Sequence, residues 1–163
     1  MILGMSLPTF TLVHVIISLI GIFAGAVVIT GMFSSKTMPR WTALFLAATV
    51  LTSVTGFFFP FSRVLPSHVV GVISLVLLAL AILALYAYRL AGRWRWIYVA
   101  CAVAAQYFNV FVLVVQAFLK IEPLHALAPT QSDPAFIVTQ LVVLVAYVAI
   151  GIAAVKRFRP ASG

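Results

Sequence analysis

The chain has 163 residues, of which 65% are hydrophobic and only 7% are charged, and its formal net charge is +8. A soluble domain carries about 25% charged residues, so this composition excludes a water-soluble protein. The one cysteine excludes an intrachain disulfide and any zinc or iron–sulfur site built from several cysteines. The basic residues lie in small groups between apolar runs, which favours contact with lipid headgroups and argues against a nucleic acid partner.

In chain order, five apolar runs are long enough to cross about 30 Å of hydrocarbon as helices. The second run, WTALFLAATVLTSVTGFFF, is the shortest, yet it holds no charged residue. A count of four, with one run merged or demoted, is the less natural alternative. The sequence therefore predicts an all-α polytopic membrane protein, a single domain over residues 1–163 with five transmembrane helices. The predicted spans are residues 9–33, 41–59, 67–89, 95–119 and 135–157.

The basic residues between the runs predict the orientation in the membrane. Eight of them fall in the first loop, the third loop and the tail, which lie on one side, whereas Arg63 and Lys120 are alone on the other. Cytoplasmic loops carry the excess of Lys and Arg, so we expect the N-terminus outside and the C-terminus in the cytoplasm. The eight residues are Lys36, Arg40, Arg89, Arg93, Arg95, Lys156, Arg157 and Arg159.

The outer loop, residues 120–134, reads KIEPLHALAPTQSDP and contains both carboxylates of the chain, Glu122 and Asp133. His125 lies between them. Three prolines in this loop predict a stiff, extended lid rather than a helix. Any chemistry is then expected within the helices or beneath this lid.

Polar side chains inside the predicted spans indicate where a ligand would bind, because polar groups in hydrocarbon usually face the bundle interior. The first span carries His14 on the same face as Gly21 and Gly25, whose GIFAG spacing is typical of a close helix crossing. Several polar residues fall toward the outer leaflet and predict an outward-facing pocket. The cofactor-binding candidates are His14, His68, Asn109, Gln116 and Gln140.

The histidines leave several interpretations open. His14 and His68 at similar depth would suit a haem iron, and His14, His68 and His125 together would suit a metal ion such as zinc or copper. A hydrolase would use Glu122 or Asp133 as general base beside such a metal. The simpler interpretation is ordinary interfacial histidines and hydrogen bonds between helices, since no HxH or HExxH spacing supports a metal.

The strings TSVTGFFFPF, YFNVFVLVVQAFLK and LHALAPTQSDP resemble those of small multi-pass bacterial inner-membrane proteins without an assigned activity. The resemblance implies a bacterial inner (plasma) membrane location and transfers no catalytic residue. We expect a small binding protein whose ligand is a haem, a metal ion, a quinone or a lipid, in membrane redox chemistry or outside it. The alternatives are a structural subunit of a homo-oligomer or larger membrane complex, and a channel or carrier for a neutral solute. Whether the chain is an enzyme stays open.

Overall fold

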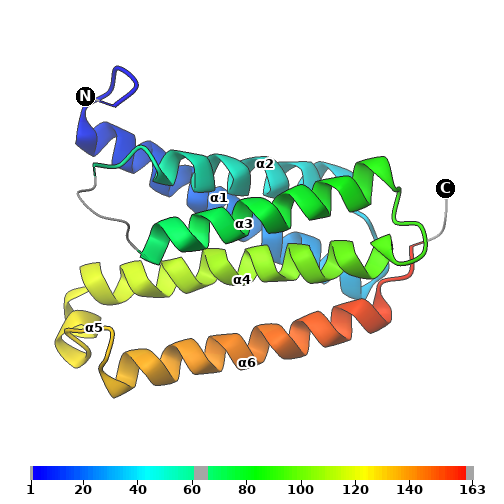
Figure 1. Cartoon of the computed structure of the whole chain (residues 1–163). Coiled ribbons are helices and arrows are strands. Elements are labelled where there is room, and N and C mark those ends of the chain that lie inside the picture. The colour runs from blue at the N-terminus through cyan, green and yellow to red at the C-terminus, as the bar shows by residue number, and fades with distance from the viewer. Residues whose placement is uncertain (1, 61–65, 161–163) are drawn as a thin grey trace.

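The computed structural model describes residues 2–60 and 66–160, and this part of the chain is predominantly helical, as predicted. The long helices run side by side, each antiparallel to the one before it (Figure 1). A short helix precedes the last long one. The elements are α1 (Leu7–Phe33), α2 (Pro39–Gly56), α3 (Pro66–Ile82) with its π-helical continuation η1 (Leu83–Ala87), α4 (Trp94–Lys120), α5 (Glu122–Leu127) and α6 (Pro134–Arg157).

Within the described residues, four helical stretches are long and apolar enough to cross a membrane, which supports a membrane protein. They are Leu7–Phe33, Ser67–Ala87, Trp94–Lys120 and Pro134–Arg157. The predicted second span is also a helix, α2, but it is not among the four. Its 18 residues make it about 27 Å long at 1.5 Å per residue, slightly less than the hydrocarbon thickness.

The prediction that residues 120–134 form an extended lid is wrong, because this segment contains α5. Pro123 lies in the first turn of that helix. A proline there removes a backbone N–H that has no partner inside the helix in any case, so it does not prevent the helix from forming.

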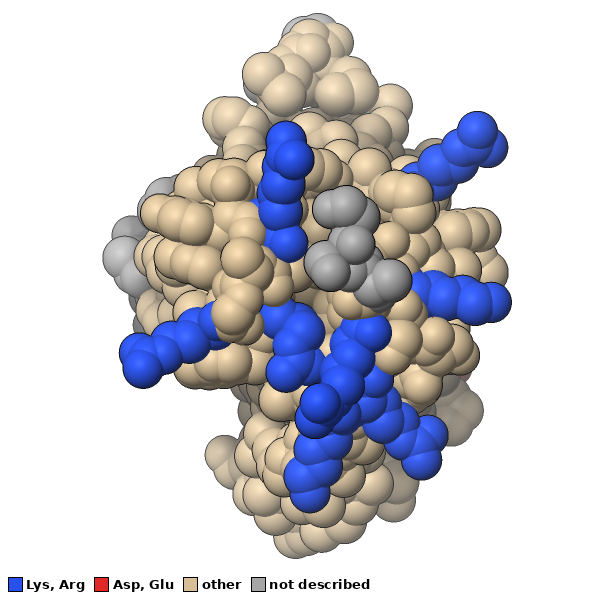
Figure 2. Space-filling model, turned by 90° about the vertical axis from the view of Figure 1, so that its right-hand side faces the viewer, with Lys and Arg blue, Asp and Glu red and all other residues tan. Residues whose placement is uncertain are grey.

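The two ends of the bundle differ in charge. The starts of α1 and α6 lie at one end with α5, whereas the α1–α2 connection, the η1–α4 connection and the end of α6 lie at the other (Figure 1). Blue Lys and Arg side chains surround this second end, and no red acidic side chain is visible there (Figure 2). We call it the basic end. It comprises the eight basic residues that the sequence groups together; Arg63 lies outside the described residues.

Aromatic residues mark the level of the basic end. All three tryptophans of the chain, Trp41, Trp94 and Trp96, lie in the first turn of α2 or α4. Trp94 also stacks on Tyr88, with ring centroids 3.8 Å apart. Tryptophan and tyrosine concentrate where hydrocarbon meets headgroups, so these rings indicate the membrane–water interface at this end.

Burial distinguishes the helix at the centre from the helix at the edge. In α4, 39% of the most apolar window is buried, compared with 11% in α6. The main cluster of buried residues is centred on α1, α2, α3 and α4 and includes Ala154 of α6; Ala24, Phe45, Leu78 and Ala102 are among its members. Helix α6 packs mainly along one face of α4 with a smaller contact to α1, and most of its remaining surface is exposed.

Candidate functional site

His14 joins α1 to α2. Its Nδ1 lies 2.8 Å from the hydroxyl of Thr55, and that hydroxyl donates its proton to the carbonyl of Leu51 at 2.6 Å. Because a threonine hydroxyl has one proton, Nδ1 of His14 must be the donor in the first bond. The other ring nitrogen, Nε2, then carries a lone pair and is the atom that is able to bind a metal or accept a proton.

The three histidines lie at two separate places: His14 and His68 lie near the segment after α2, and His125 lies near the end of α4. His68 lies beside Phe57, with ring centroids 5.6 Å apart, and His14 meets Phe59 edge-on at 5.1 Å. Both therefore lie against the segment that follows α2. His125 instead donates from Nδ1 to the carbonyl of Phe118 at 3.2 Å, which closes the last turn of α4. In residues 2–60 and 66–160, no three His, Cys, Asp or Glu side chains lie close enough to hold a metal together.

The predicted amide residues do not converge on one point. Asn109 donates to the hydroxyl of Thr49 at 3.1 Å, linking α4 to α2. Gln140 donates to the carbonyl of Phe111 at 3.1 Å, linking α6 to α4. Gln116, by contrast, is exposed on the surface of α4. Two of the three amides thus connect neighbouring helices.

Gln106, which faces the bundle from α4, is 1% exposed and contacts α1. Its amide nitrogen donates to the carbonyl of Ile22 at 2.8 Å. A Cβ built on Gly25 would lie 2.1 Å from the amide oxygen Oε1, so a Cα–H bond of Gly25 points at that oxygen. Such Cα–H···O contacts are common where helices cross closely. The GIFAG glycines therefore pack within one chain, Gly21 against Thr49 and Gly25 against Gln106.

The two acidic residues of the 120–134 segment have structural neighbours. The Asp133 carboxylate accepts hydrogen bonds from the backbone N–H and the hydroxyl of Thr130, at 2.7 and 2.8 Å. These two bonds lower the pKa of the Asp133 carboxyl below its ordinary value. Glu122 lies in the first turn of α5, where a carboxylate is favoured by the helix dipole. Both positions thus stabilise the connection between α4 and α6.

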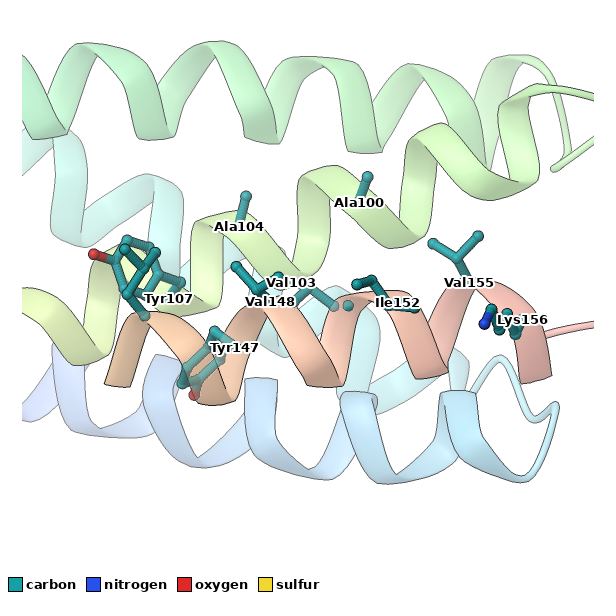
Figure 3. A pocket seen from close by; sticks show the side chains of 11 residues that line it. Ala100, Val103, Ala104, Tyr107, Tyr147, Val148, Ile152, Val155 and Lys156 are labelled. Carbon is teal, nitrogen blue, oxygen red and sulfur yellow. The ribbon is translucent and has the colours of Figure 1, made fainter. Parts of the chain in front are cut away.

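A groove of about 500 Å³ lies between α4 and α6 (Figure 3). Ala100, Val103, Ala104 and Tyr107 form the α4 wall, and seven residues from Leu144 to Lys156 form the α6 wall. The wall residues recur at intervals of three and four, which places them on one face of each helix. The groove is open to the surface, because two of its walls, Val148 and Ile152, are 53% and 54% exposed.

Small side chains account for the width of the groove. Ala100 and Ala104 fill little of the space on the α4 side of the groove. Gly151 lets α6 approach α4 closely, since a Cβ there would lie 3.5 Å from Val103. Tyr107 and Tyr147 lie together at one end with ring centroids 5.9 Å apart, and Lys156 lies at the other (Figure 3). The hydropathy pattern did not predict this site. Two features of the sequence could have indicated it: the alanines at positions 100 and 104, which are four residues apart, and Lys156 in the last turn of α6.

Comparisons of the chain with protein-family models, with curated proteins and with solved structures found no match. Its own geometry is therefore the basis on which a function is proposed.

Proposed function

We propose that the chain is an integral membrane protein that binds one amphipathic, lipid-like ligand in the groove between α4 and α6. The observation that carries the proposal is the groove itself, about 500 Å³ in volume, with almost entirely apolar walls and a single charged residue, Lys156, at its end. Binding pockets for small molecules usually measure about 300–1,000 Å³ and combine apolar walls with a few polar groups. A ligand with a long apolar tail and a polar head fits this pattern.

The proposal includes five membrane crossings, an outer N-terminus and a cytoplasmic C-terminus in a bacterial inner membrane. The return of the chain supports the fifth crossing: α1 ends at the basic end, and α3 starts at the opposite end (Figure 1). Helix α2 runs between these ends beside α1. The charge of the basic end supports the orientation, because cytoplasmic loops are enriched in Lys and Arg.

Native mass spectrometry of the full chain, purified with its endogenous lipids, tests the groove. Ala104→Leu combined with Val148→Trp fills the groove from both walls. We expect the wild type to retain one bound molecule of lipid mass and the filled variant to lose at least about tenfold in occupancy, as a groove of fixed volume cannot hold both.

The matched control places the same changes on the face of α6 away from the groove, as Ala149→Leu with Val145→Trp. Val145 is 67% exposed and does not line the groove. This variant should keep the adduct. Equal occupancy in all three proteins would show that the retained lipid binds elsewhere and would remove the proposal.

A second candidate site lies at the opposite end, where His14 and His68 flank the segment after α2. The observation in its favour is the hydrogen bond between Nδ1 of His14 and Thr55, which leaves the Nε2 lone pair for a haem iron or a quinol proton. If haem binds there, the purified protein shows a Soret band that His14→Ala abolishes. A colourless wild-type protein excludes haem at this site, and Thr55→Val serves as the control that removes the His14 contact but keeps the imidazole.

A further inference from the structure

The groove has a polar end at a defined depth. Its α6 wall runs from Leu144 to Lys156, twelve residue steps and about 18 Å along the helix. One leaflet contributes about 15 Å of hydrocarbon, half of a core about 30 Å thick. The groove therefore has the length of a single leaflet, with Lys156 at headgroup level and Tyr147 near the middle of the membrane.

The tryptophans support this depth independently. Trp94 and Trp96 begin α4 at the basic end, and Lys156 lies in the last turn of α6 at the same end. Because tryptophan side chains settle at the interface, the Lys156 ammonium lies at the level where lipid phosphates are found. An acyl chain entering there would run down the groove toward Tyr107 and Tyr147.

Lys156 is the cation in position to meet a ligand, since its neighbours contact the protein. Arg95 donates to the carbonyls of Phe158 and Val155, and the guanidinium of Arg157 lies 5.9 Å above the Phe33 ring. Lys156 is exposed and lines the groove. Both acidic side chains, Glu122 and Asp133, lie beyond the other end of α4 and α6, too far away to neutralise it.

We propose, building on the lipid-binding function above, that the occupant is an anionic phospholipid of the leaflet at the basic end. One acyl chain lies in the groove, and the headgroup phosphate contacts Lys156. Charge complementarity favours this occupant over a zwitterionic lipid, because Lys156 places a positive charge at the end of the groove and no acidic side chain is visible around it at the basic end (Figure 2). It also favours a lipid over a helix from a second copy, since a transmembrane segment of this chain brings no negative charge to that level.

The test compares phosphatidylglycerol with phosphatidylcholine of identical acyl chains, added to the delipidated full chain and counted by native mass spectrometry. We expect the wild type to bind phosphatidylglycerol about fivefold more tightly, the ratio expected for one basic side chain near an anionic headgroup. Lys156→Gln should abolish this preference while one lipid of either kind still binds. The groove-filled variant should bind neither.

The matched control is Lys36→Gln, which removes the same charge at the same end of the bundle but outside the groove. It should keep the preference. An equal loss in both lysine variants would show that the preference comes from the general potential of the basic end, which overturns the role of Lys156. A wild type that binds both lipids equally well overturns the inference and leaves the proposed function intact. If filling the groove abolishes a dimer instead of a lipid adduct, the occupant is a second copy and both proposals fail.

Discussion

At position 25 the backbone of α1 approaches α4 so closely that any side chain would displace a buried amide. We predict that Gly25→Ala lowers the free energy of unfolding by about 1–3 kcal/mol, the usual cost of overpacking. The added Cβ would lie 2.1 Å from Oε1 of Gln106 and 2.9 Å from the Phe45 ring. Gln106 would have to move and lose its bond to Ile22. Thermal unfolding in detergent gives the measurement.

Gly21→Ala, one turn earlier on the same face, is the control for that prediction. Its Cβ would meet Thr49 at 3.3 Å, a distance that a small shift of one hydroxyl relieves. The Gly21 variant should therefore lose clearly less stability. Equal losses at both positions would mean that general packing along this face matters here, not the contact with Gln106.

The polar residues of the spans illustrate what a sequence can reveal at this scale. Contacts with other helices were foreseeable, since polar groups avoid hydrocarbon, and although Gln116 is exposed, His14, Asn109 and Gln140 do face other helices. Their partners were not foreseeable. Each bonds to a hydroxyl or carbonyl on an adjacent helix, and the choice depends on the rotation of each helix about its axis. Whether any of them also contacts a ligand stays a prediction.

At the scale of elements, hydropathy predicted the helices well. The predicted span 9–33 corresponds to α1, 95–119 to α4 and 135–157 to α6, each within two residues at either end. Long apolar runs have few ways to satisfy their backbone groups in a membrane other than as helices. One structural error concerned α5, where three prolines were given more weight than the position of Pro123 in a first turn.

The groove escaped prediction for a different reason. Residues that line it, such as Ala104 and Val148, have the same apolar character as residues that face lipid. Hydropathy separates polar from apolar positions, but it does not separate a helix face packed on a neighbour from one held slightly apart. The gap between α4 and α6 depends on side-chain size at the crossing near Gly151, which only coordinates reveal.

For the whole molecule, the number of crossings has a direct consequence for which loops share a side of the membrane. With five crossings, Leu3 and Ser132 lie on the same side and Ala91 on the opposite side. With four, α2 would not cross, so Leu3 and Ala91 would share a side and Ser132 would lie opposite. We predict the first arrangement, because α2 connects opposite ends of the bundle (Figure 1).

Three single-cysteine variants measure this: Leu3→Cys, Ala91→Cys and Ser132→Cys, each in a Cys101→Ala background. All three target positions are exposed, whereas the native Cys101 is buried. A membrane-impermeant maleimide applied to intact cells should label positions 3 and 132, and position 91 should react only after permeabilisation. Labelling at positions 91 and 3 together would show that α2 does not cross the bilayer and that the chain has four crossings. Labelling at 91 alone would keep five crossings but invert the protein, placing the basic end, and with it Lys156, in the outer leaflet.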